Sequence, residues 1–247
     1  SFRLEFLNAA GDVIGTPAGA IAWLAWDWSH SRSLDSAEDA IFDQVVQWRP
    51  FEPTPSGQVV VVEIDECSIE FFRGRGEGGW PWSRQRHADL LDQLDRAGVR
   101  AVGYDVLFAD PSPGDPLGDQ TLEAMARGGA GRFVFGSTRL HPDYDGNSSL
   151  RVSQAPAAFA LLADPRNDPR VALLLPYGEA MARYSAIANV TRNKDGVLRD
   201  IALHEAVGDW ALPSLALRVA TTVMPQSTTP PAAAVRPNWR QDTRLPH

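Results

Sequence analysis

Aspartate residues are expected at the ends of two buried strands, where their carboxylates could do chemistry. Val59–Ile64 is a short apolar run that ends at Asp65. A second apolar run, Arg100–Phe108, carries Asp105 near its end, and Asp110 follows it. In open α/β sheets, ligands bind beyond the carboxyl ends of the strands. If the two strands are neighbours, these carboxylates converge and could hold Mg²⁺ or Ca²⁺ through oxygen ligands, or bind an amine.

The same aspartates allow several interpretations. A metal site of Asp65, Asp105 and Asp110 could serve a metal-dependent hydrolase. An aspartate at the end of a strand also often caps the helix or turn that follows it. Arg84 and Arg199 could instead be ion-pair partners of these acids, which would hold a loop and a hairpin to the sheet. The sequence leaves these alternatives open.

A glycine-rich loop with two tryptophans is a second candidate site. Residues 72–82 contain four glycines, but these come about nine residues after the strand, so they match neither phosphate-binding glycine pattern. Trp80 and Trp82 with Arg84 could stack on a planar or anionic ligand, or the tryptophans could seal the edge of the core. The complete set of candidate ligand-binding residues is Asp65, Trp80, Trp82, Arg84, Asp105 and Arg199.

Other kinds of site find little support. The formal net charge of -8 argues against a nucleic-acid partner, which would require a basic face. The sequence has no Gly-x-Ser-x-Gly motif, and its five histidines lie in unrelated contexts, so we assign no catalytic residue. Cys67 is the one cysteine, which excludes an intrachain disulfide, and we expect it in the core. No cofactor is indicated apart from a possible divalent cation.

The candidate residues must be positioned by a helix between two strands. Ser83 can cap a helix whose apolar stripe includes Leu91 and Leu94. Gly98 suits the end of this helix, because helices often stop at a residue with positive φ. Strand, helix and strand then form a βαβ unit with a right-handed crossover. Phe133–Gly136 is expected as a further strand.

The rest of the chain completes an α/β pattern. Tyr184–Val190 and Val197–Leu203 are expected to form a hairpin, because the Asp195-Gly196 pair suits a type I′ turn. Further helices are expected over residues 34–48, 119–128, 155–163 and 213–223. The predicted fold class is α/β, with a mainly parallel central sheet flanked by helices and an antiparallel hairpin at one edge. With 247 residues, the chain is long enough to bury a sizeable core.

Several of these motifs also occur together, in the same order, in a known family. They are Ile64-Asp65-Glu66, the loop Trp80–Arg84, His87, the run Ala97–Phe108, Asp195–Arg199 and Pro213–Leu217. Over roughly residues 34–222 the chain resembles the second class of CHASE domains, the extracytoplasmic sensor domains of bacterial membrane receptors. The resemblance implies a sensing module without a defined reaction. It also implies a histidine kinase, nucleotide cyclase or similar output enzyme outside this chain, and signalling as a homodimer.

The flanking segments suit such a receptor. Residues 34–224 are the expected sensor domain, and the Pro-rich residues 225–247 are expected to be a linker. Residues 1–33 are interpreted as membrane-proximal, although residues 17–28 could equally form an amphipathic helix that packs on the domain. The start at Ser1, without methionine, suggests a fragment or a processed form. The expected location is the periplasmic or extracellular face of the inner membrane, with a small ligand or a periplasmic protein as partner; an interaction module with no small ligand is a further alternative.

Overall fold

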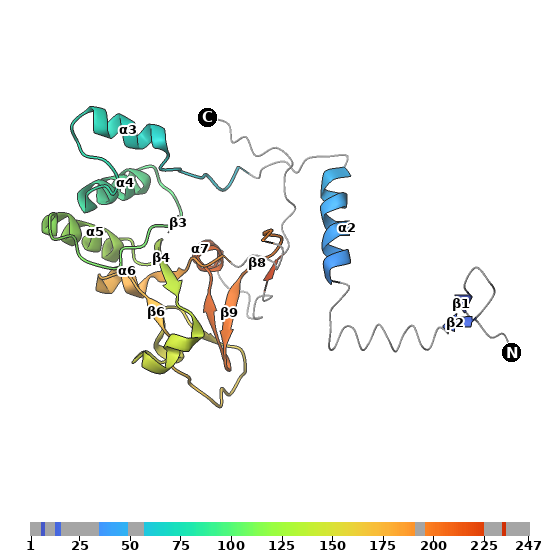
Figure 1. Cartoon of the computed structure of the whole chain (residues 1–247). Helices are drawn as coiled ribbons and strands as arrows, with labels where there is room; N and C mark the ends of the chain where they lie inside the picture. Colours follow the sequence, from blue (N-terminus) through green and yellow to red (C-terminus); the bar gives the residue numbers. More distant parts are fainter. Residues whose placement is uncertain are drawn as a thin grey trace. The chain divides into compact units, whose positions relative to one another are not determined.

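A computed structural model gives the three-dimensional arrangement of the chain (Figure 1). It describes residues 6–7, 13–15, 35–48, 57–190, 196–224 and 234–235. The chain divides into two compact units, residues 61–237 and residues 1–60 with 238–247. The second of these contains the antiparallel pair β1 (Phe6–Leu7) and β2 (Val13–Gly15) and the helix α2 (Asp35–Trp48), which confirms the helix expected over residues 34–48.

The unit of residues 61–237 is built on a parallel sheet. In this sheet β4 (Phe133–Arg139) lies between β3 (Val102–Tyr104) and β7 (Ser185–Ile187), and both neighbours are parallel to it. A short strand, β6 (Leu173–Leu174), pairs antiparallel with the end of β4. The mixed α/β class with a mainly parallel central sheet is therefore confirmed.

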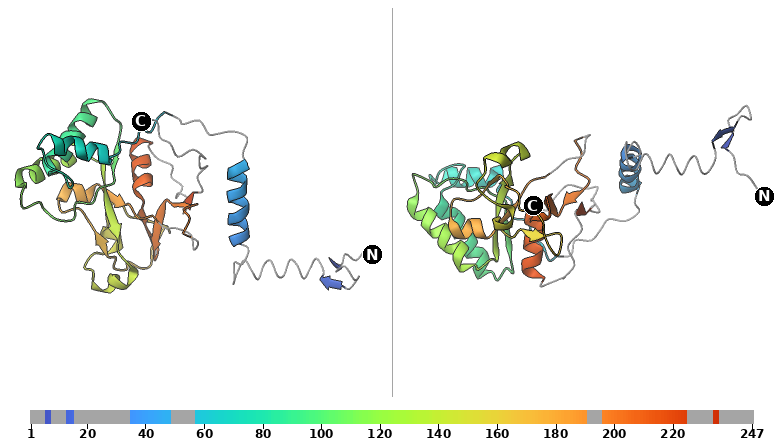
Figure 2. Two further views of the ribbon diagram at one scale, coloured as in Figure 1. Left: turned by 45° about the horizontal axis from the view of Figure 1, so that its top comes forward. Right: turned by 90° about the horizontal axis from the view of Figure 1, so that it is seen from below.

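Helices cover both faces of this sheet (Figures 1 and 2). One face packs on α4 (Arg84–Arg96), α5 (Pro116–Gly128) and α6 (Glu179–Arg183) through a core that includes Leu91, Phe108, Leu122, Phe135 and Met181. The other face carries α7 (Leu215–Val223). Gly103 permits this close approach, because an added Cβ there would lie 3.0 Å from Cγ2 of Val219.

Local capping explains where these helices begin. Ser83 accepts a hydrogen bond from the Arg86 amide at the start of α4, and Gly98 has a positive φ of 77° just beyond its end, as expected. Asp115 caps α5 and Ser214 caps α7 in the same way. The helices expected over residues 119–128 and 213–223 are thus confirmed, with small differences at their starts.

A separate antiparallel sheet supplies the hairpin of the fold. It contains β5 (Phe159–Ala160), β10 (Trp210–Pro213) and β9 (His204–Val207), in that order. The hairpin is β9–β10, whose turn includes Gly208 at a φ of 63°. The single-turn helices η2 (Pro142–Asn147) and η3 (Val152–Gln154) lie in the connection between β4 and β5. A second core cluster, which includes Val152, Val171 and Leu212, packs in this region.

Four expectations about secondary structure were wrong. The apolar run Val59–Ile64 forms no strand, and its four valines are 56% to 81% exposed. The predicted loop after it begins as a helix, α3 (Glu66–Gly74), in which Cys67 is exposed rather than in the core. Residues 155–163 contain β5 in place of a helix.

The predicted hairpin of residues 184–203 was also wrong. Its first half is β7, which pairs in parallel with β4. Its second half contains β8 (Ile201–Ala202), which pairs antiparallel with β11 (Ala234–Val235). The buried environment of β7 explains the difference, because a fully buried strand next to β4 satisfies the same apolar pattern as a hairpin strand. Residues 191–195, with part of the expected turn, lie outside the described residues.

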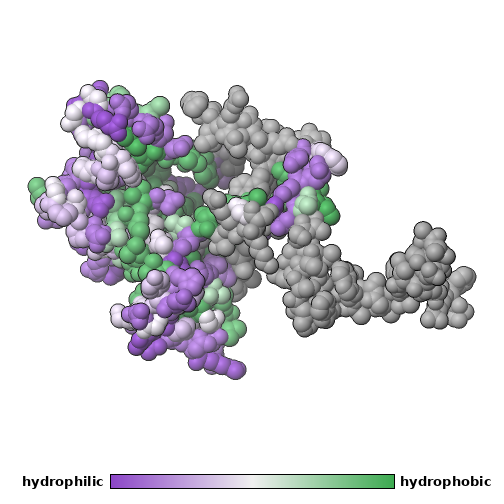
Figure 3. All heavy atoms as spheres, viewed as in Figure 1, coloured by the Kyte–Doolittle hydropathy of each residue, from purple (hydrophilic) through white to green (hydrophobic). Residues whose placement is uncertain are grey.

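The loss of the first expected strand leaves β3 with β4 as its one partner among the described residues. Figure 3 shows apolar residues along the middle of the α/β unit, where β3 and β4 run, and hydrophilic residues over the outer surfaces of the helices. The expected membrane-proximal and linker segments, residues 1–33 and 225–247, lie almost entirely outside the described residues.

Candidate functional site

The tryptophan loop brings its two indoles together, but in different environments. Trp80 and Trp82 flank a cis peptide bond at Pro81, and their rings are 6.0 Å apart in an edge-to-face arrangement. Trp82 is 9% exposed and packs edge-on against Phe72 of α3, whereas Trp80 is 47% exposed. Trp82 is therefore part of the core of this region, and Trp80 covers it.

The arginine expected beside these indoles is held elsewhere. Arg84 donates to the carbonyl oxygen of Asp110 at 2.9 Å, and its Nε lies 3.4 Å from Oδ1 of Asp119. Its guanidinium lies over the ring of Phe108, 4.6 Å from the centroid. The side chain thus ties the start of α4 to the loop after β3.

Arg86, which was not predicted from the sequence, packs against the buried part of the tryptophan loop. Its guanidinium lies 3.9 Å from the centroid of Phe72 and 5.9 Å from that of Trp82, and it forms an ion pair with Glu77 at 2.7 Å. Arg86 was missed because α3 was not predicted and its partner Phe72 was assigned to a loop. The loop residues form a packed cluster of rings and guanidinium groups.

A buried histidine–tyrosine pair lies beneath this cluster. His87 of α4 is 1% exposed, and its Nδ1 lies 2.8 Å from the hydroxyl of Tyr104 in β3. Burial, together with the charges of Arg84 and Arg86, lowers the pKa of His87 from 6.5 to about 4. Burial also raises the pKa of Tyr104. Both groups are therefore neutral at pH 7, and the pair acts as a polar link between helix and sheet.

The strand-end aspartates serve separate positions. Asp65 caps α3, since its Oδ1 accepts from the backbone amide of Ser68 at 2.8 Å and from its hydroxyl at 2.6 Å. Asp105 and Asp110 are exposed after β3. In the part of the chain that the structure describes, no three His, Cys, Asp or Glu residues gather so that they could hold a metal ion. Arg199 is buried, at 4% exposed.

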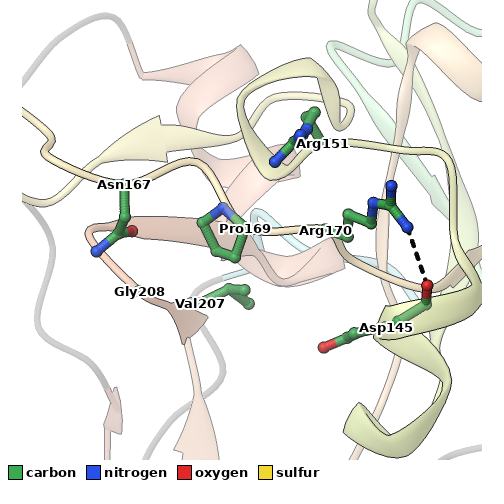
Figure 4. A pocket seen from close by; sticks show the side chains of 8 residues that line it. Asp145, Arg151, Asn167, Pro169, Arg170, Val207 and Gly208 are labelled. Carbon is green, nitrogen blue, oxygen red and sulfur yellow. Dashed lines mark hydrogen bonds between the residues drawn. The ribbon is translucent and has the colours of Figure 1, made fainter.

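A wide cleft lies at a different place, between η2, η3 and the β9–β10 turn (Figure 4). Its volume is about 590 Å³, within the range of small-molecule sites. Its lining residues are Asp145, Gly146, Arg151, Asn167, Pro169, Arg170, Val207 and Gly208. None of these was among the candidate site residues predicted from the sequence.

Asp145, one of the residues that line the cleft, is held by an ion pair with the buried Arg139. Arg139, at the end of β4, binds both carboxylate oxygens of Asp145 at 2.7 and 2.8 Å, and its Nε donates to Glu205 of β9 at 3.1 Å. Burial disfavours ionisation of Asp145, but hydrogen bonds from Arg139 and from the Ala172 amide outweigh it and lower the pKa of this carboxyl. The ion pair thus joins the parallel sheet, η2 and the antiparallel sheet.

Comparison with known protein families decides the kind of module to which these features belong. The family model of the CHASE2 domain matches residues 18–247. The chain belongs to the CHASE2 family. CHASE2 domains are extracytoplasmic sensor domains of receptors, and they are not catalytic. The resemblance read from the sequence motifs is therefore confirmed.

More distant comparisons add nothing to this assignment. Neither the curated proteins nor the solved structures include a significant match to this CHASE2 domain. Among the helices that the structure describes, none has the length and apolar character needed to cross a membrane.

Proposed function

We propose that this CHASE2 domain is the signal-input part of a bacterial transmembrane receptor whose output is a histidine kinase or a nucleotide cyclase. The family assignment over residues 18–247 is the observation that carries the proposal. In this proposal the domain lies on the periplasmic side of the inner membrane, acts as a homodimer and binds a small ligand. A ligand changes the output when its affinity differs between two states of the domain.

The position of α7 suggests how a change in the domain reaches the output. This helix packs directly on the parallel sheet, where Leu215 and Val219 lie next to Gly103 of β3. None of its residues is fully buried, so a modest change in the sheet can shift the helix without opening a core. The helix is followed by residues 225–247, of which β11 pairs with β8 of the same unit.

The test uses the full-length receptor in membranes, with autophosphorylation or cyclic nucleotide formation as the readout. Gly103→Ala places a methyl group 3.0 Å from Val219, and we expect it to displace α7 and change the basal output. Gly128→Ala at the end of α5 is the control, because nothing lies within 4 Å of the added methyl. If neither Gly103→Ala nor removal of the domain changes the output, the proposal is wrong.

The hydrolase alternative receives no support from the arrangement of the acids. A metal-dependent hydrolase would require Asp65, Asp105 and Asp110 to share a cation, and the described residues contain no such group. Asp65 has a sufficient structural role as the cap of α3.

A further inference from the structure

We propose that the cleft between η2, η3 and the β9–β10 turn binds a small organic carboxylate through Arg151 and Arg170. This inference deepens the proposed function, since it rests on the domain having a small ligand, and it names the chemistry of that ligand. These two arginines form an unfavourable arrangement of like charges, which a bound anion would relieve.

Arg151 and Arg170 face each other across an antiparallel bridge. The Val152 amide donates to the carbonyl of Pro169 on one side of them, and the Val171 amide donates to the carbonyl of Leu150 on the other, both at 3.0 Å. This makes the arginines a non-hydrogen-bonded pair, the kind in which opposite side chains lie closest. Like charges directly opposite each other destabilise a strand pair. The arrangement therefore costs stability unless something offsets it.

Within the part of the chain that the structure describes, neither arginine forms an ion pair, although Asp168 lies close enough to attract Arg151. Arg151 donates to the backbone carbonyl of Asp168 at 2.8 Å. Arg170 donates to the backbone carbonyl of Gly146 at 3.0 Å (Figure 4). Among the described residues, eight other arginines do form ion pairs: Arg73, Arg84, Arg86, Arg96, Arg127, Arg132, Arg139 and Arg183. The remaining donors of the two guanidinium groups stay available to a ligand.

The acids close to the cleft are already engaged. The carboxylate of Asp168 accepts from the amide and the hydroxyl of Ser153 at 3.0 and 2.8 Å, and these hydrogen bonds lower its pKa. Asp145 is bound by Arg139 and by the amide of Ala172. Neither of these two acids forms an ion pair with Arg151 or Arg170, so the two guanidinium groups keep donors for a ligand although acidic and basic groups around the cleft are balanced.

The other walls suit an organic anion better than a bare one. Pro169 and Val207 provide apolar surface, and Gly208 leaves room beside them. Asn167 accepts a hydrogen bond from the Asp209 amide through Oδ1 at 3.1 Å, so its amide nitrogen can donate to a polar group of the ligand. Guanidinium groups bind carboxylates through paired hydrogen bonds. A carboxylate on a short apolar body matches this combination.

The experiment measures binding to the chain itself by calorimetry and thermal unfolding. The probes are succinate, glutarate and benzoate, compared with succinamide, a neutral isostere, and with inorganic phosphate. We expect saturable binding of at least one carboxylate, no binding of succinamide, and a Kd at least about tenfold weaker in Arg151→Gln and Arg170→Gln. Arg166→Gln is the matched control, because Arg166 is an exposed arginine of the same region that does not line the cleft.

Three outcomes with the unmodified protein would overturn the proposal. They are the absence of binding by every carboxylate, equal binding of succinamide, and phosphate binding as tight as that of the best carboxylate. A loss of binding in Arg166→Gln equal to that in Arg151→Gln would overturn it as well. These outcomes are separate from the receptor assay, because carboxylate binding without any change in output would refute the proposed function and leave the site intact. An effect of Gly103→Ala on the output without any carboxylate binding would refute the carboxylate site and leave the proposed signal-input function intact.

Discussion

The buried pair of His87 and Tyr104 makes the stability of the domain depend on pH in a defined window. His87 has a pKa of about 4 in the folded protein, against 6.5 for an unperturbed histidine. Between these values the unfolded chain binds more protons than the folded one, so the free energy of unfolding rises with pH. The stabilisation is fully present above about pH 6.5 and is lost as the pH falls towards 4.

The magnitude follows from the same two values. The fall in the pKa of His87 from 6.5 to about 4 corresponds to at most about 3 kcal/mol of stability, because a change of one in a pKa is worth about 1.4 kcal/mol. Most of it should be lost early, with about 2 kcal/mol gone between about pH 7 and about pH 5. The carboxyls of Asp145 and Asp168 have pKa values below the usual 3.8, so they do not contribute to the change between about pH 7 and about pH 5.

Urea unfolding at a series of pH values measures the effect. The control is His87→Phe combined with Tyr104→Phe, which removes both polar groups and keeps two rings in a cluster that already includes Trp82 and Phe108. The variant should lose about 2 kcal/mol less than the wild type between about pH 7 and about pH 5. Equal losses in the two proteins would refute the assignment of the pH dependence to His87, whatever the absolute stability of the variant.

Four substitutions test the packing around the candidate sites, each by urea unfolding. Trp82→Ala should cost about 3 to 5 kcal/mol and Trp80→Ala less than about 1.5, because Trp82 is the buried member of the pair; similar costs would contradict this division. Asp65→Ala should cost about 0.5 to 2 kcal/mol and speed amide exchange at the start of α3, through loss of the cap; unchanged exchange there would argue against the cap. Arg139→Gln should cost about 3 kcal/mol, since it leaves Asp145 without its cation; a cost below about 0.5 would show that the pair is not important for stability.

Much of the helical architecture could be predicted from local signals. The helices α2, α4, α5 and α7 were expected because capping residues and apolar periodicity act within one segment. The strand β4 was expected because Phe133–Gly136 is a short apolar run, and such a run is typical of a strand that is buried on both faces. The strand at Val59–Ile64 was wrong, because an apolar run indicates affinity for a core but does not specify a strand to pair with.

The candidate sites were less predictable, since they depend on contacts between distant segments. The proximity of Trp80 and Trp82 follows from their spacing, but the partner of Arg84 is Asp119, thirty-five residues further on. The cleft requires the bridge between Arg151 and Arg170 and the β9–β10 turn to meet. Neither segment has a periodic sequence pattern that predicts this pairing. From the sequence alone, the two arginines therefore look like ordinary surface residues.

The exposed valines at residues 59–62 have a consequence for how the chain can be cut. The boundary between the two compact units falls between Val60 and Val61, inside this run. Exposed backbone without secondary structure is where proteases act most readily. A brief digestion should therefore separate the α/β unit from α2 at this run. The unit could then be studied by itself, with its sheet, its cleft and its buried histidine in place.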